Sequence, residues 1–205
     1  LSRTHIVPIS VTQDTAGPMT RFVEDAALML SIMAGTDPAD PYTRLADSRK
    51  RDYTSDLDKP LKGKRIGVFT AVQGNHPAII SAFEASAKTM QALGAELVII
   101  DNFKTPEEFW DKALNVLLSE FKHELNLYLE LAAPAVKART LADLIEFNKT
   151  NKREMVLFDQ SLFAQSQATT GYDEDYFNTV AFLQNATRKQ GIDLLLTKYN
   201  VDAIM

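Results

Sequence analysis

The fold is decided by residues 65–100, which open on the run Arg65-Ile66-Gly67-Val68-Phe69 and close on the run Glu96-Leu97-Val98-Ile99-Ile100. Both runs are short and apolar, as buried strands are. Between them, apolar residues recur at helical spacing from about Pro77 to Leu93. Two short strands joined by a crossover helix predict a parallel pair that is covered on both faces. The expected fold class is therefore α/β.

Further elements flank this β-α-β unit, to which we assign residues 65–101. Residues 201–205 (Val-Asp-Ala-Ile-Met) have the character of a buried strand that is just beginning, so we expect a partial mixed or parallel sheet. Residues 36–64 are polar and weakly periodic, and we interpret them as a connector. We expect residues 105–199 to form a large helical portion. We expect residues 1–205 to make up a single incomplete domain.

Helical periodicity predicts five helices outside the β-α-β unit. The first covers about residues 20–34, and the second is a long helix that starts near Thr105-Pro106 and ends before Pro134. The third is capped by Thr140, the fourth covers about residues 151–167, and the fifth covers 173–199 with a bend near Gly191. The long helix carries an apolar stripe that we interpret as core; its members are Trp110, Leu114, Leu117, Phe121, Leu125 and Tyr128.

Both ends of the sequence suggest a fragment. The chain opens on Leu1 and closes inside the predicted strand at Met205. Natural chains seldom stop within a strand, because its backbone groups need partners. We therefore expect that the sequence is one portion of a longer protein.

Composition excludes several classes of function. A net charge of −5 does not favour nucleic-acid binding, which needs a basic face. No apolar run approaches the roughly 20 residues of a membrane-spanning helix. The absence of cysteine excludes disulfides, thiol catalysis and zinc–thiolate sites. No secretory signal begins the sequence, so we expect a cytoplasmic location, although an upstream leader would be invisible here.

Residue types alone single out no catalytic or metal site. Glu120 and His123 have the E-x-x-H spacing of a di-iron helix, but such a site needs a second copy, which the sequence lacks. No G-x-S-x-G or phosphate-binding loop is present. A Ser–His–Asp triad stays open, because its members can lie anywhere in a sequence. We expect no cofactor and no metal.

The run Ile9-Ser10-Val11-Thr12-Gln13-Asp14-Thr15-Ala16-Gly17-Pro18-Met19-Thr20-Arg21-Phe22-Val23-Glu24-Asp25-Ala26-Ala27-Leu28 resembles a segment of the amidase signature family, P-x-S-x-x-x-D-T-x-G-P-M-x-R-x-V-x-D-A-A-L. Residues 30–40 resemble the L-x-x-[ML]-[AV]-G-x-D-P-x-D pattern of the same family, and residues 61–68 resemble its L-K-G-x-R-I-G-V pattern. Residues 148–163 resemble a run of its peptide-amidase-like branch, with Asp159 and Ser161 in place of Gly and Glu.

The resemblance implies hydrolysis of amide C–N bonds by a Ser–cisSer–Lys triad. The nucleophile of the family precedes the matched segment on a Gly/Ser-rich loop. This sequence has no G-x-S-S-G-S run and no lysine in the family's motif. The resemblance therefore implies an amidase portion without catalytic residues, inactive alone, whose parent enzyme acts on a small-molecule amide. Exposed core surface would allow self-association.

The same resemblance suggests which residues support the site. Asp14 and Gly17 follow the nucleophile loop closely in the family and would support it. Phe158, Gln160 and Phe163 would form part of a substrate-binding wall. The alternatives are turn stabilisation for Asp14 and core packing for the two phenylalanines. Two other functions also stay open: a non-catalytic α/β binding module, and one piece of a split amidase that is active only when complemented.

Overall fold

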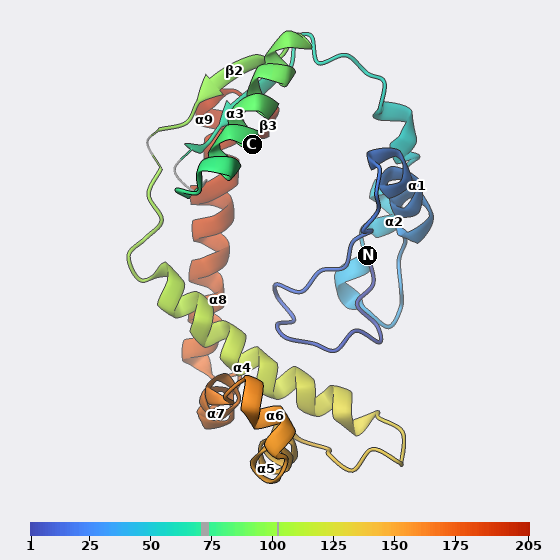
Figure 1. Cartoon of the computed structure of the whole chain (residues 1–205), viewed down its shortest axis with the longest axis vertical. Helices are drawn as coiled ribbons and strands as arrows, with labels where there is room; N and C mark the ends of the chain where they lie inside the picture. The colour runs from blue at the N-terminus through green and yellow to red at the C-terminus, as the bar shows by residue number, and fades with distance from the viewer. Residues whose placement is uncertain (71–73, 102) are drawn as a thin grey trace. The chain divides into compact units, whose positions relative to one another are not determined.

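The computed structural model describes residues 1–70, 74–101 and 103–205, and Figure 1 labels its helices and strands. The chain divides into two compact units. One contains Leu1–Leu57 and Asp111–Thr179, and the other contains Asp58–Trp110 and Val180–Met205. The expectation of one incomplete domain stays a prediction.

The second unit contains a parallel sheet of three strands in the order β2-β1-β3, of which Figure 1 labels β2 and β3. Strand β1 (Arg65–Val68) pairs with β2 (Glu96–Ile99) on one side and with β3 (Ala203–Ile204) on the other. Helix α3 (Pro77–Ala92) connects β1 to β2. The predicted α/β class is confirmed, including the partial sheet, the β-α-β unit and the terminal strand.

A bend near Gly191 divides the last helical segment, as predicted. Helix α8 (Glu174–Thr187) continues into the π-helical turn η4 (Arg188–Ile192) and then into α9 (Asp193–Tyr199). Gly191 has φ −107° and ψ −113°, which is not helical. A Cβ atom at this position would lie 2.6 Å from the carbonyl oxygen of Ala186, so the bend requires glycine. The segment then reaches the buried Leu195 and Val201, which belong to the core of the second unit with Val68, Ala95, Ile100 and Ala186.

The first unit is helical. Its N-terminal part contains α1 (Val23–Met33), η1 (Pro41–Thr43), α2 (Ala46–Arg49) and η2 (Tyr53–Asp56). Its other part contains most of α4 (Phe109–Glu130), α5 (Leu141–Thr150), α6 (Lys152–Leu157) and α7 (Ser161–Ala168). Leu125 and Leu129 of α4 form a buried cluster with Leu141 of α5, and Phe163 of α7 packs against it. Thr140 and Asp143 form the capping box that starts α5.

Two helical predictions need correction. The helix expected over 151–167 is interrupted between α6 and α7, where Phe158 is extended. Oδ1 of Asp159 accepts hydrogen bonds from the backbone N–H and the hydroxyl of Ser161, an arrangement that competes with a continuous helix. In α4, Trp110 is 72% exposed, and the buried side chains are instead Val116, Leu118, Glu120, Leu125 and Leu129. The N-terminal end of the predicted apolar stripe, at Trp110, therefore does not belong to the core.

No helix in the described part of the chain is long and apolar enough to cross a membrane.

Candidate functional site

The opening segment forms a tight turn over Ser10–Asp14. The backbone N–H groups of Gln13 and Asp14 donate to the carbonyl oxygen of Ser10 over 3.0 and 2.7 Å. Oδ2 of Asp14 in turn accepts from the backbone N–H groups of Ile9 and Ser10, over 2.9 and 3.0 Å. An aspartate that binds nearby backbone in this way stabilises the turn locally.

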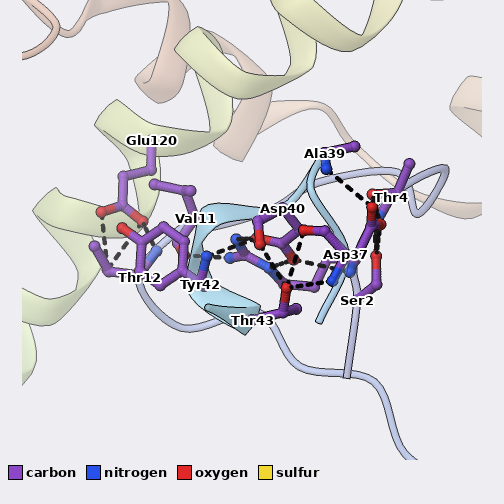
Figure 2. A network of polar contacts seen from close by, with 11 residues as sticks. Ser2, Thr4, Val11, Thr12, Asp37, Ala39, Asp40, Tyr42, Thr43 and Glu120 are labelled. Atoms are coloured by element: carbon purple, nitrogen blue, oxygen red, sulfur yellow. Dashed lines mark hydrogen bonds and ion pairs between the residues drawn. The ribbon is translucent and has the colours of Figure 1, made fainter. Parts of the chain in front are cut away.

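A buried carboxylate on α4 holds this turn. Glu120 is 0% exposed, and it accepts from the Ser10 hydroxyl. It also accepts from both the backbone N–H (3.1 Å) and the hydroxyl (2.8 Å) of Thr12, and Figure 2 shows the Glu120 carboxylate facing Thr12. The Tyr176 hydroxyl of α8 donates to its Oε1 atom over 2.8 Å. A single carboxylate therefore joins the turn, α4 and the start of α8.

The tyrosines beside Glu120 are stacked hydrogen-bond donors. The rings of Tyr172 and Tyr176 stack with centroids 4.3 Å apart, and the Tyr172 hydroxyl donates to Oε1 of Glu124 over 2.8 Å. Burial, reinforced by these carboxylates, raises the pKa of both tyrosines above the usual value. Both hydroxyls are therefore protonated at neutral pH and can act as donors.

A second set of polar contacts, the Arg3–Asp40 clamp, holds the turn through the carbonyl oxygen of Val11. The Arg3 guanidinium donates to the carbonyl oxygen of Val11 and binds the Asp40 carboxylate through Nη2 (2.7 Å) and Nε (3.0 Å). Asp40 also accepts from the backbone N–H groups of Arg3 and Tyr42. The Arg3 hydrogen bond, more than any other contact, keeps the pKa of Asp40 well below its usual range.

Asp37 has a structural role beside the Arg3–Asp40 clamp. Its Oδ2 atom accepts from the hydroxyls of Ser2 and Thr4, both over 2.6 Å, and Figure 2 shows these contacts beside Asp40. Asp37 and Asp40 are the two acids of the D-P-x-D pattern noted in the sequence. Together they fasten residues 2–4 to the segment that follows α1.

The spacing of Glu120 and His123 does not bring them into one cluster. Glu120 is enclosed by hydroxyl and N–H donors, whereas His123 is exposed and its ring lies against Tyr172, with centroids 4.4 Å apart. Among the described residues, no group of three or more His, Cys, Asp or Glu side chains could hold a metal ion.

The predicted pocket residues lie in different environments. Phe158 is 79% exposed, whereas Phe163 packs on the α4–α5 cluster and its ring lies 5.4 Å from that of Phe121. Gln160 donates through Nε2 to the Ile145 carbonyl oxygen over 3.4 Å, while its buried Oε1 has no hydrogen-bond partner. Gly17 is exposed, and nothing lies within 4 Å of the place that a Cβ would take.

Sequence reasoning missed Glu120, Arg3 and Asp40 as the residues that organise the turn. One signal for Glu120 existed, because it stands four residues after Val116 on a helix and so shares its buried face. Arg3 and Asp40 are 37 positions apart, and no local pattern connects them.

The second unit contains an open apolar groove of about 540 Å³ along α3. Its lining includes His76 and Ser86 as the polar residues, together with Ala78, Ile79, Ala82, Phe83 and Met205. None of the predicted site residues contributes to it.

Comparison with known proteins identifies the family. The family model described as Amidase matches residues 1–205, the whole chain. The chain belongs to the amidase family. A probable amidase of Arabidopsis thaliana is 32% identical over 216 residues, which cover 100% of this chain and 40% of that protein.

Solved amidases have the same fold. The peptide amidase from Stenotrophomonas maltophilia matches with a TM-score of 0.89 and 35% identity, over 99% of this chain and 42% of that one. An amidase family protein from Bacillus anthracis matches with a TM-score of 0.83 and 32% identity, over 99% of this chain and 40% of that one. The chain thus spans about two-fifths of the length of these amidases, and the peptide-amidase-like resemblance is confirmed.

Proposed function

We propose that this chain is part of an amidase that hydrolyses a carboxylic amide to the acid and ammonia or an amine. The family match over residues 1–205 supports this activity. We further propose that the Ser–cisSer–Lys triad lies in polypeptide that precedes the given sequence, and that the 205-residue chain is inactive alone. The absence of a G-x-S-S-G-S run from the sequence supports this second step.

In the complete enzyme, the triad would follow the logic of an activated nucleophile. A serine hydroxyl is a weak nucleophile until a neighbouring base removes its proton. The lysine would act as that base, with the second serine relaying the proton, and backbone N–H groups of the nucleophile loop would stabilise the oxyanion.

The contribution of this chain would be scaffold and pocket wall. Asp14 and Gly17 would support the nucleophile loop, and the closed turn around Asp14 fits a supporting role. Phe158 and Phe163 would line the substrate pocket together with Gln160. The Gln160 Oε1 atom is buried and has no hydrogen-bond partner among the described residues, so it is an unsatisfied acceptor beside the proposed wall.

Peptide amides are the first substrates to test, because the solved relative from Stenotrophomonas maltophilia is a peptide amidase. The parent enzyme would thus act on small amides. The expected cytoplasmic location and the self-association through exposed apolar surface belong to this proposal as well.

The test is ammonia release from benzamide, an amino-acid amide and a peptide amide. We expect no turnover by the purified 205-residue chain and no labelling by a fluorophosphonate. We expect turnover when the chain is produced as part of the complete protein that its reading frame encodes. Turnover by the 205-residue chain alone would overturn the proposed location of the triad, and inactivity of the longer protein on all amides would favour a non-catalytic binding module. Activity after mixing separate portions would favour a split amidase.

A further inference from the structure

We propose that Glu120 is a positioning residue, whose buried carboxylate sets the place of the Ser10–Asp14 turn. This inference rests on the proposed function in one respect, namely that the turn supports the nucleophile loop of the amidase. The contacts of Glu120 are independent of that function, and they carry the inference.

The first observation is that the carboxylate is fully satisfied by hydrogen bonds. Glu120 accepts from four donors, which are the hydroxyls of Ser10, Thr12 and Tyr176 and the backbone N–H of Thr12. Four donors match the acceptor capacity of an ionised carboxylate. Within residues 1–70, 74–101 and 103–205, Glu120 forms no ion pair, so these donors alone compensate for its burial.

The second observation is that three of the four donors belong to the turn. They come from Ser10 and Thr12, and one of them is a backbone N–H, so the contacts fix the main chain as well as two side chains. The Arg3 guanidinium holds the intervening Val11 carbonyl oxygen. Residues 10, 11 and 12 are therefore each held by a polar contact from outside the turn.

The third observation is that apolar packing contributes little at this place. Ile6, Val7 and Ile9, which lead into the turn, are 45%, 57% and 51% exposed. The stabilising free energy of hydrophobic burial is proportional to the apolar area removed from water, so these half-exposed side chains anchor the segment weakly. The polar contacts, with Glu120 at their centre, determine where the turn lies.

Tyr176 orients the carboxylate. Its hydroxyl donates to Oε1, the atom that also accepts from the Thr12 hydroxyl, while Oε2 accepts from the Ser10 hydroxyl and the Thr12 N–H. Tyr176 is only 9% exposed and stacks on Tyr172, so its ring is held in place. Burial also raises the Tyr176 pKa, which keeps the hydroxyl a donor.

The test measures amide hydrogen exchange at Thr12 by NMR and compares the native 205-residue chain with three variants of it. Glu120→Leu removes the acceptor, and Glu120→Gln retains one oxygen for the Thr12 N–H. The matched control is Glu124→Gln, which lies one turn further along α4 and binds Tyr172 instead of the turn. We expect Glu120→Leu to speed exchange at Thr12 about 10- to 100-fold, as the loss of one hydrogen bond to a charged acceptor would. Glu120→Gln should restore most of the protection, and Glu124→Gln should leave it unchanged.

A second variant keeps the test decisive if Glu120→Leu does not fold. Ser10→Ala combined with Thr12→Val removes the two turn hydroxyls and leaves Glu120 in place; we again expect faster exchange at Thr12, with α5 amides unchanged. Unchanged exchange at Thr12 in Glu120→Leu, or in the double variant where Glu120→Leu does not fold, would overturn the proposal. So would an equal effect of Glu124→Gln.

The catalytic consequence has its own readout. In the longer, active protein, Glu120→Leu should lower kcat and leave KM nearly unchanged, because the turn supports the nucleophile loop and does not bind substrate, whereas Glu120→Gln should retain most of the native kcat. Unchanged kcat together with faster exchange at Thr12 would overturn the link to catalysis. If the longer protein hydrolyses no amide, the proposed function fails, while the exchange experiment still decides whether Glu120 holds the turn.

Discussion

Asp40→Asn tests the clamp between Arg3 and the turn. The Asp40 carboxylate receives four N–H donors: Nη2 and Nε of Arg3, and the backbone N–H groups of Arg3 and Tyr42. None of these donors can accept a hydrogen bond. An amide NH2 at this position would therefore face two N–H groups where the native oxygen accepts two hydrogen bonds.

The magnitude follows from those two lost contacts. A hydrogen bond to a charged group contributes about 1.5–3 kcal/mol, so losing two would cost about 3–6 kcal/mol. The Asp40 side chain is 4% exposed and that of Arg3 is 16% exposed, so water can compensate for part of the loss at the guanidinium. We therefore expect the free energy of unfolding to fall by about 3–4 kcal/mol, within the range for breaking a buried ion pair. At about 2–4 °C per kcal/mol, the Tm would fall by roughly 6–16 °C.

The assay is urea and thermal unfolding followed by circular dichroism, with Glu146→Gln as the matched control. Glu146 pairs with Lys149 on the surface of α5, where the two side chains are 66% and 59% exposed, so its loss should cost less than about 0.5 kcal/mol. An Asp40→Asn cost below about 1 kcal/mol, or one equal to that of the control, would refute the reasoning.

The pH dependence of the difference provides a further check. Because the pKa of Asp40 is lowered in the folded chain, its stabilising effect is present above the unfolded-state pKa of about 3.9 and is lost as the pH falls through the folded-state pKa. The stability difference between the native chain and Asp40→Asn should thus be constant from about pH 5 to 8 and shrink below about pH 4. A difference that grows on acidification would contradict the assigned direction of the pKa shift.

Three further predictions concern packing. Leu141→Ala, at a side chain that is 0% exposed, should lower the free energy of unfolding by about 2–5 kcal/mol, whereas Leu131→Ala, at 90% exposure, should change it by less than about 0.5 kcal/mol in the same urea titration. Gly67→Ala should cost about 1–3 kcal/mol, since its Cβ would lie 2.6 Å from Cδ1 of the fully buried Ile100, and a melt equal to that of the native chain would show that Ile100 adapts freely. Ile32→Lys, at 71% exposure on α1, should leave stability unchanged and lower self-association in sedimentation experiments; unchanged association would mean that α1 is not the contact surface.

Local patterns predicted most of the elements of the fold. The strands at residues 65 and 96 and the helix between them are close to their predicted bounds, because buried strands and amphipathic helices have distinct apolar periods. Thr140 starts α5 for an equally local reason, since its capping box involves residues only three positions apart. The interruption at Asp159 was missed because its side chain competes with the helix through a single local contact, which periodicity does not reveal.

Local patterns could not predict the exposure of Trp110 or the role of Glu120. Helical spacing defines which residues share a face, but whether that face is covered depends on other segments of the chain. Trp110 is exposed although it heads an apolar stripe, and Glu120 is buried although it is charged. Hydrogen-bond donors from residues 10, 12 and 176 make the burial of Glu120 possible. No local sequence pattern predicts them, because these residues are far from Glu120 along the chain.

The sequence by itself determined the family, the α/β class and the parallel pair of strands, because these depend on motifs and periods that extend over a few neighbouring residues. Only the tertiary structure decided how the turn at residues 10–14 is held. The hydrogen bonds that hold it, made by Arg3, Asp40 and Glu120, join residues that are 8 to 110 positions apart in the sequence. A hydrogen bond requires two groups to lie within about 3 Å of each other, and folding alone brings groups so distant in sequence that close.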